Sequence, residues 1–218
     1  GKYEDVLEDE TLNSMVPLWK KAKKDVTQEE LNEFYKAKFM DYQDPMLSLQ
    51  ISTEGVISYN ALLFIPKKPP YDLYSENYEK GLQLYTKGVF IMDKCKELVP
   101  DYLRFLKGLV DSSDLSLNIS REMLQQDKQL VKIQANLEKK LLSELARLRD
   151  NEFDKYVEFF DNYGINLKYG VYDGYGVNKE KLQDLLIYQT VNEDKKVTLK
   201  QYVEKMPEKQ EFIYYDSA

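Results

Sequence analysis

The fold is decided by a strand-rich stretch at residues 47–65, which reads LSLQISTEGVISYNALLFI. Leu47, Leu49 and Ile51 alternate with polar residues, which is the two-residue period of a strand with one buried face. A Thr-Glu-Gly turn separates this strand from a run of branched and aromatic residues that Pro66 ends. The stretch therefore predicts a β-hairpin.

Further elements extend this hairpin on both sides. Two apolar runs of strand length, at 82–92 and 104–110, predict a sheet of four or more strands. A capping box at Thr27 begins a helix that runs to about Met40. Apolar residues recur every three or four positions over 127–149, which predicts a long helix that packs on the core rather than forming a coiled coil. We therefore expect an α/β (α+β) fold whose larger subdomain is a mixed-sheet α/β/α unit.

The C-terminal third predicts a helical connector and a smaller α/β/α unit. The connector helix is expected to end at Gly164, where a left-handed residue would close it, and the glycines of 170–176 indicate a loop. Residues 179–186 predict a helix, Thr198 caps another helix, and 211–215 predict a terminal strand.

These patterns divide the chain into four parts. We expect a flexible acidic tail at 1–11, a larger α/β subdomain at 12–148 that ends in the long helix, a helical connector at 149–170, and a smaller α/β subdomain at 171–218. Because the last predicted strand ends so close to Ala218, we also expect the native chain to continue.

Composition limits the partners. The 31 Lys and Arg against 38 Asp and Glu give a net charge of -7, which repels a phosphate backbone, so nucleic acid is not expected as a partner. The lysines between Lys20 and Lys24 are interpreted as a solvated surface. No apolar stretch approaches the about 18 residues of a membrane span and no signal peptide is present, so we expect a cytoplasmic protein without membrane contact.

Composition also limits the chemistry. The absence of histidine removes the commonest general base, the histidine-dependent nucleophile arrangements and the commonest zinc ligand, so no metal site is expected. Cys95 is the single cysteine, which excludes an intrachain disulfide, and it is interpreted as an incidental thiol. No G-x-x-x-x-G-K-[ST] phosphate loop appears.

One polar loop, residues 111–126, leaves a predicted strand and feeds the long helix; it reads DSSDLSLNISREMLQQ. The Arg121 guanidinium is charged at any relevant pH, and its fork of donors matches the oxygens of a phosphoryl group. Gln125 could order the same loop or hydrogen-bond a nucleotide, and Asn118 and Ser120 could hold the loop backbone. On these residues alone, Arg121 is more ordinarily a surface residue.

This loop resembles the catalytic loop of the middle segment of the ninety-kilodalton heat-shock chaperone family. The resemblance covers nearly the whole chain and is closest to the bacterial member. It is carried by the loop and by Pro17-Leu18-Trp19, the helix at 27–35, Leu63-Phe64-Ile65-Pro66, residues 88–93, residues 102–114 and Ile213-Tyr214-Tyr215.

The resemblance implies a catalytic site split between domains. In this family an N-terminal domain binds ATP and magnesium, and a C-terminal domain joins two protomers. Arg121 is then expected to contact the terminal phosphate and Gln125 to support the same active conformation, whereas the water-activating carboxylate lies outside this sequence. We expect the isolated chain to be monomeric, to carry no cofactor and to be inactive, and the full-length chaperone to be a homodimeric, ATP-hydrolysing heat-shock protein that assists protein folding.

The resemblance also implies a surface for unfolded client proteins. Trp19 matches a position implicated in that contact, although it could equally be a buried packing residue, and Tyr71 and Tyr74 are weaker candidates. Two other classes of function stay open. One is a stand-alone protein-binding scaffold without a catalytic role, and the other is an independent hydrolase that uses Asp111 and Asp114.

Overall fold

The computed structural model describes residues 16–191 and 194–216, with the side chain of Arg121 also outside the described part. The predicted acidic tail at 1–11 therefore lies outside the described residues. The described residues form six α-helices, which are α1 (Gln28–Phe39), α2 (Arg121–Leu124), α3 (Lys128–Asn151), α4 (Phe153–Gly176), α5 (Lys179–Leu182) and α6 (Leu199–Glu204). They form seven strands, which are β1 (Leu47–Thr53), β2 (Tyr59–Ile65), β3 (Leu82–Thr86), β4 (Val89–Cys95), β5 (Lys107–Ser112), β6 (Ile187–Gln189) and β7 (Lys196–Thr198).

Short 3-10 turns connect several of these elements. Within the described residues they are η1 (Leu18–Lys20), η2 (Lys23–Asp25), η3 (Lys96–Leu98), η4 (Asp101–Leu103) and η5 (Gln183–Leu185).

A five-stranded mixed sheet has the order β1-β2-β5-β3-β4. The β1–β2 pair is the hairpin predicted from 47–65, with Leu47 opposite Ile65. β5 pairs antiparallel with β2 and parallel with β3, so the sheet is mixed as expected. β1 and β4 form its two edges.

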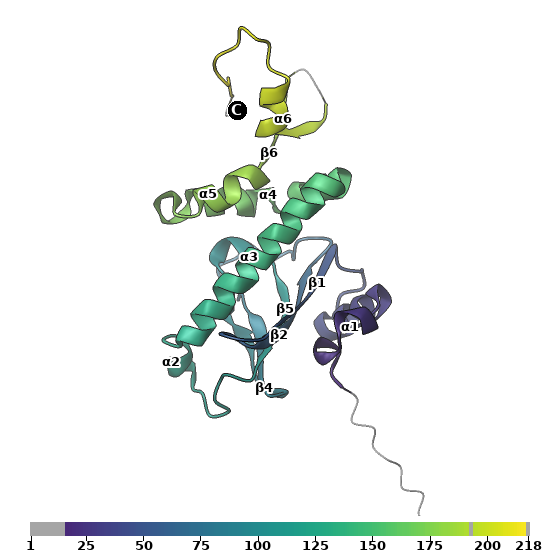
Figure 1. The fold of residues 1–218 in the computed structure, drawn as a ribbon, viewed down its shortest axis with the longest axis vertical. Coiled ribbons are helices and arrows are strands. Elements are labelled where there is room, and N and C mark those ends of the chain that lie inside the picture. Colours follow the sequence, from purple (N-terminus) through teal and green to yellow (C-terminus); the bar gives the residue numbers. More distant parts are fainter. Residues whose placement is uncertain (1–15, 192–193, 217–218) are drawn as a thin grey trace, which may run out of the picture.

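Both faces of the sheet are covered by helices. On β2, Ala61 and Leu63 join the core cluster that contains α3 and α4, whereas Leu62 and Phe64 join the cluster beneath α1 and η1. Figure 1 shows the sheet between α3 on one side and α1 on the other. This three-layer arrangement confirms the predicted α/β class.

Local signals place the two helices that flank the sheet. Thr27 caps α1, because its side chain accepts from the Glu30 N–H and the Glu30 carboxylate accepts from the Thr27 N–H. Asp127 caps α3 by accepting from the N–H groups of Gln129 and Leu130. The apolar stripe of α3 is buried in the core, so its repeat reflects packing, as predicted: Leu130, Ile133, Leu137, Leu141, Leu145 and Leu148.

The run at 82–92 is two strands, which corrects the prediction of one. Lys87 and Gly88 both adopt positive φ (50° and 78°) and form a tight turn between β3 and β4. The run at 104–110 likewise contributes a strand only from Lys107, because η4 precedes it. The division of the run at 82–92 into β3 and β4 gives the sheet its fifth strand.

Gly164 does not end the connector helix, which corrects a second prediction. A Cβ at Gly164 would lie 2.8 Å from the Phe160 ring, and one at Gly170 would lie 2.6 Å from Tyr102, so both glycines permit close packing of α4. The helix continues to residue 172 and then leaves helical geometry at residues 173–176, where Gly174, Tyr175 and Gly176 have positive φ, so the predicted loop covers only the end of 170–176.

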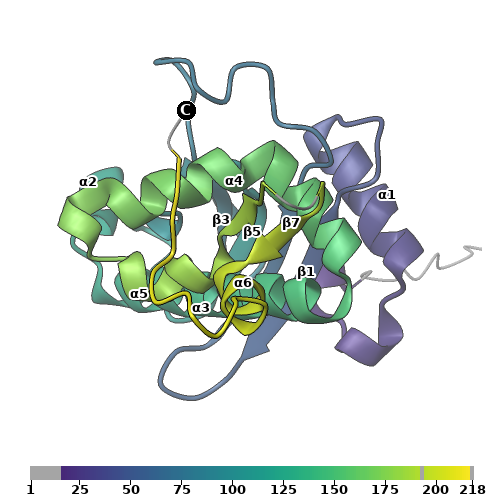
Figure 2. The ribbon, with the colours of Figure 1, turned by 90° about the horizontal axis from the view of Figure 1, so that it is seen from above.

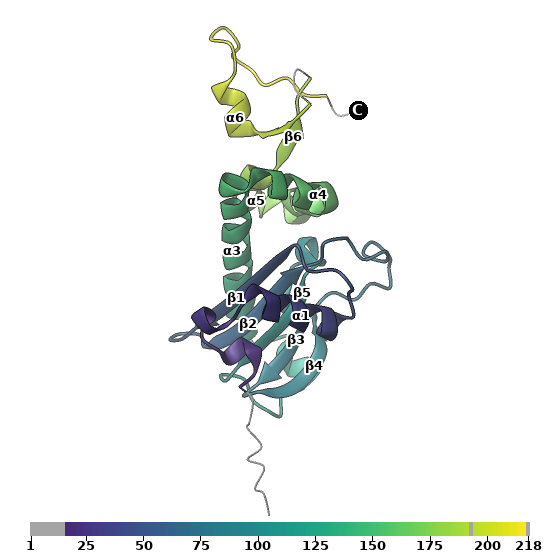
Figure 3. The same ribbon diagram turned by 90° about the vertical axis from the view of Figure 1, so that its right-hand side faces the viewer.

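The C-terminal elements lie beyond α4 and α5. Along the long axis, α4 and α5 separate the five-stranded sheet from β6 and α6, and the view from above shows α4 lying across the molecule (Figures 2 and 3). A capping box at Thr198 begins α6, as predicted. The strand predicted at 211–215 is absent: these exposed residues form no strand in the described structure. The boundaries predicted at 148 and 170 stay predictions.

Gly108 permits the closest backbone approach in the sheet. Its φ is +143°, and a Cβ there would lie 2.0 Å from the Leu62 carbonyl oxygen on β2. We predict that Gly108→Ala lowers the free energy of unfolding by about 3 kcal/mol or more, because both the clash and the backbone conformation are unfavourable. Urea denaturation followed by circular dichroism measures this loss.

Gly55→Ala is the matched control for this prediction. Gly55 also has positive φ (+120°) but no atom within 4 Å of the added Cβ, so the substitution is expected to cost only about 1 kcal/mol. Equal losses for the two variants would contradict the close approach at Gly108.

Candidate functional site

The loop between β5 and α3, residues 113–127, is anchored firmly where it leaves the sheet. The Thr86 hydroxyl donates to the carbonyl oxygens of Ser112 (2.6 Å) and Leu115 (3.2 Å), and the Ser112 hydroxyl donates to the Ser58 carbonyl (2.9 Å). The Asp114 carboxylate accepts from the Ser58 N–H at 2.9 Å. These bonds tie the start of the loop to both β2 and β3.

The far end of the loop forms a single helical turn. The Ser120 hydroxyl accepts from the Met123 N–H (3.3 Å) and so caps α2, which places Arg121 at the first position of that turn. Leu124 is buried and holds the turn against the core. Ser120 thus caps this turn, and its predicted role as a support of a catalytic loop stays a prediction; the Arg121 side chain lies outside the described part of the structure.

The other two predicted loop residues are exposed. The N–H of Asn118 donates to the Ser116 hydroxyl (3.3 Å), so at this position the backbone makes the contact that stabilises the loop. Gln125 follows α2 and lines a hollow that also contains Tyr78, Lys80, Met92, Lys94 and Arg104. Arg121 and Gln125 thus belong to one short segment, and their predicted catalytic roles stay predictions.

The hollow beside Gln125 is lined by four cations, Lys80, Lys94, Lys96 and Arg104, and two of them have partners. Lys80 pairs with Asp101 at 2.7 Å, and the Arg104 guanidinium lies 5.3 Å from the centre of the Tyr78 ring. Burial and the neighbouring Lys94 lower the pKa of Lys107 below its ordinary value. Within the hollow, Lys80 and Arg104 are therefore fixed by a carboxylate and an aromatic ring, respectively.

Asp111, one residue before the end of β5, is the most highly connected polar group near the loop. The side chain is buried, and its Oδ2 accepts from the Trp19 indole Nε1 at 2.9 Å. Its Oδ1 accepts from the Gly88 N–H (3.2 Å), and Lys20 Nζ lies 3.6 Å from Oδ2. Asp111 thus links η1, the β3–β4 turn and the strand that leads into the loop.

Trp19 is a packing residue in this structure. It is 9% exposed, and its ring lies 5.0 Å from the ring of Tyr85 and 6.1 Å from that of Phe34. A buried and hydrogen-bonded indole is not available as a surface anchor, so the client-contact alternative for Trp19 does not fit this conformation.

The two tyrosines of the loop after β2 differ from Trp19. Tyr71 is fully exposed, whereas Tyr74 is about half exposed and donates its hydroxyl proton to Asn166 Oδ1 on α4 (2.7 Å). They remain candidates for a protein-binding surface.

The geometry offers little to an independent hydrolase. Asp111 accepts from an indole and a backbone amide, and Asp114 accepts from a backbone amide, so each carboxylate is engaged in holding the loop.

Cys95 is buried, and desolvation together with Glu97 raises its pKa to about 12, so the thiol is protonated at neutral pH. Among the described residues, no group of three or more His, Cys, Asp and Glu could hold a metal ion.

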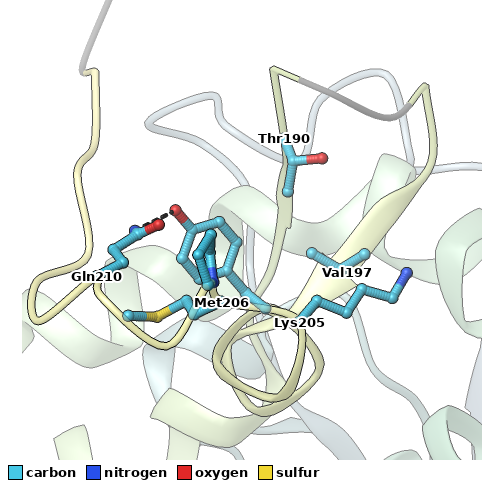
Figure 4. Close-up of a pocket in the computed structure, with 7 residues that line it drawn as sticks. Thr190, Val197, Lys205, Met206 and Gln210 are labelled. Atoms are coloured by element: carbon cyan, nitrogen blue, oxygen red, sulfur yellow. Dashed lines mark hydrogen bonds between the residues drawn. The ribbon is translucent and has the colours of Figure 1, made fainter.

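A separate pocket lies among the C-terminal elements (Figure 4). Its seven lining residues are Thr190, Val197, Tyr202, Lys205, Met206, Pro207 and Gln210. The Tyr202 hydroxyl accepts from Gln210 Nε2 at 3.2 Å. The lining contains no carboxylate and no thiol.

The role of Asp111 was missed by sequence reasoning. Asp111 and Trp19 are 92 positions apart, and nothing in the local pattern of either residue pairs them. The one available signal was the position of an aspartate at the end of an apolar strand, where a buried polar side chain has to find partners.

None of the described helices is long and apolar enough to cross a membrane.

Comparison with known proteins identifies relatives of the entire chain. The family model described as Hsp90 protein matches residues 2–218. A chaperone protein HtpG of Fusobacterium nucleatum is 53% identical over 98% of this chain, and one of Bacillus subtilis is 50% identical over 99%. The chain spans 35% and 34%, respectively, of the length of these two relatives.

A solved structure shares the fold. The middle domain of a Plasmodium falciparum heat shock protein superimposes with a TM-score of 0.80 at 34% identity, over 92% of this chain and 78% of that chain.

The indole hydrogen bond gives a direct test of the Asp111 network. We predict that Trp19→Phe lowers the free energy of unfolding by about 2 to 3 kcal/mol, because it leaves a buried carboxylate oxygen without its donor and reduces packing. Tyr42→Phe, at a fully exposed position, is the control and is expected to change stability by less than about 0.5 kcal/mol. Similar small changes in both variants, measured by urea denaturation, would show that Trp19 is not part of the network.

Cys95 gives a pH-dependent test of burial. Because folding raises its pKa from about 8.5 to about 12, the thiol stabilises the fold fully below pH 8.5 and loses that contribution as pH rises towards 12. We predict slow reaction with a disulfide reagent at pH 8, becoming fast in urea, and a loss of stability relative to Cys95→Ala above pH 8.5. Fast labelling of the folded chain would contradict the assigned burial.

Proposed function

The chain belongs to the Hsp90 protein family, and from this premise we propose that it is the middle segment of an ATP-dependent molecular chaperone. The supporting observation is the anchored loop that follows β5, because its sequence carries the family resemblance and its geometry fixes where Arg121 begins α2. The proposed cellular site is the cytoplasm.

We propose that Arg121 contacts the terminal phosphate of ATP held by a separate N-terminal domain. An arginine presented at the start of a short helical turn carries a permanent charge and a fork of donors, which fits the oxygens of a transferring phosphoryl group. The bound ATP, with magnesium held by the other domain, supplies the phosphoryl group. Gln125, exposed just after the same turn, is proposed to support the conformation in which Arg121 faces the nucleotide.

This division of residues would make hydrolysis conditional on domain docking. A charge that crosses an interface stabilises phosphoryl transfer only when that interface is closed. The hydrogen bonds that Thr86 and Ser112 donate and Asp114 accepts favour this proposal, because they fix the start of the loop to the sheet. Movement of the whole domain would then carry Arg121 towards or away from the phosphate.

We also propose that the full-length protein binds partly folded client proteins and dimerises through a C-terminal domain. Tyr71, exposed after β2, and the neighbouring Tyr74 are the residues of this chain that we assign to client contact. The alternative, a stand-alone scaffold, would need the same exposed tyrosines but would give Arg121 no role.

The proposed role of Arg121 can be tested in the full-length protein. We predict that Arg121→Ala lowers the rate of ATP hydrolysis by at least about tenfold and leaves ATP binding unchanged, because a group that acts on the transferring phosphate contributes mainly to the transition state. The rate of ATP hydrolysis by Arg121→Lys is expected to lie between that of the unchanged protein and that of Arg121→Ala, because lysine keeps the charge and loses the fork of donors. Turnover and nucleotide affinity are measured separately.

Two controls accompany this measurement. Lys132→Ala removes an exposed cation from α3 and is expected to leave turnover unchanged. The isolated chain is expected to hydrolyse ATP negligibly, and mixing it with the N-terminal domain should raise turnover. Unchanged turnover in Arg121→Ala would refute the assigned role, and robust hydrolysis by the isolated chain would refute the split site.

A further inference from the structure

A basic groove runs along the free edge of the five-stranded sheet. β1 pairs with β2 on one side only, and Figure 3 shows it at the outer edge of the sheet. Four consecutive residues of this strand, 49–52, line the groove. One wall comes from residues 20–23, which join η1 to η2, and the other comes from α3. Edge strands with unpaired backbone groups are places where extended polypeptide segments bind.

The α3 wall presents one regular stripe of polar side chains. The lining residues recur at helical spacing along this face of α3: Asn136, Lys139, Lys140, Ser143, Glu144 and Arg147. Opposite them, Gln50 of β1 donates to the Lys21 carbonyl (2.8 Å), which fixes the second wall to the strand. The groove is therefore built from three elements held in a defined arrangement.

The groove is strongly positive in a chain whose net charge is -7. Its lining holds six cations, Lys20, Lys21, Lys23, Lys139, Lys140 and Arg147, and one carboxylate, Glu144. Three of the cations already have carboxylate partners: Lys20 lies near Asp111 (3.6 Å), Lys21 near Glu30 (3.2 Å) and Arg147 near Glu144 (2.7 Å).

The remaining three lysines are exposed. For Lys23, Lys139 and Lys140, the described part of the chain offers no carboxylate within 4 Å. Two of these lysines are neighbours on α3 and the third lies on the opposite wall, so an anionic segment between the walls would meet charge on both sides.

We propose that the acidic N-terminal residues 3–12 of this chain, YEDVLEDETL, bind in this groove. These residues carry five carboxylates and no basic side chain, and they lie outside the described part of the structure. Val16, the first described residue, precedes by four positions the lysine that opens the groove wall. Ten extended residues span roughly 33 Å, enough to follow a seven-residue strand.

Charge and tethering both favour this occupant. Opposite charges within about 10 Å attract appreciably at moderate salt, and a covalently attached segment acts at an effective concentration of about millimolar. The alternative is that the lysines only protect an edge strand from aggregation, in which case no segment occupies the groove. This inference does not depend on the proposed role of Arg121.

A spin label placed in the acidic segment can distinguish these cases. Leu7→Cys provides the attachment site in the 218-residue chain, and Cys95 stays unlabelled because it is buried. We predict that the label broadens amide NMR signals of residues 49–52 and 136–147 at low salt, and that 0.5 M NaCl removes most of this broadening.

Charge-reversal variants make the test specific. Lys139→Glu with Lys140→Glu should abolish the broadening, and adding Glu8→Lys with Asp9→Lys should restore it. Lys128→Glu with Lys132→Glu, on the same helix but outside the groove, is the matched control and should retain it. Broadening that is absent at low salt, or that is unaffected by the Lys139 and Lys140 changes, would overturn the proposal. Broadening that appears only when labelled and isotope-enriched chains are mixed would do the same, because it would make a second copy the occupant.

Discussion

The arrangement around the candidate loop depends on the contacts of one buried carboxylate, that of Asp111. An ionised side chain inside a protein is tolerated only when hydrogen bonds and a counter-charge replace its water. Trp19, Gly88 and Lys20 supply these, and they come from the N-terminal layer and from the turn between β3 and β4. Asp111 therefore connects the N-terminal layer and the β3–β4 turn to the strand that carries the loop, so the position of the loop depends on contacts made far from it in sequence.

Sequence reasoning succeeded where the determinants are local. The capping boxes at Thr27 and Thr198 and the apolar stripe of α3 each lie within a few positions of the structure they specify. Hairpin alternation over 47–65 likewise gave β1 and β2. These elements account for the α/β class and for the strand-to-helix setting of the loop, whereas Arg121 was singled out by the family resemblance of the loop.

Sequence reasoning failed where long-range packing decides. Gly164 has the features of a helix end, yet in the fold it makes room for Phe160, and α4 continues past it. Residues 211–215 are rich in the aromatic and branched residues of a strand, but a strand needs a partner edge, and none forms among the described residues. The local sequence around Trp19 is compatible with either a buried or an exposed indole, and its burial depends on the bond to Asp111, 92 positions away. In the candidate site, the loop and its cap could thus be anticipated, whereas the network that holds the loop could not.

The central claim is that this loop meets the terminal phosphate of a nucleotide bound by another domain. The most direct measurement is photo-crosslinking of the full-length protein with an ATP analogue whose reactive azide is attached to the terminal phosphate. The account predicts labelled peptides from residues 113–127, and loss of that labelling when the N-terminal domain and this chain are prevented from docking. Labelling confined to the N-terminal domain under conditions that support hydrolysis would contradict it.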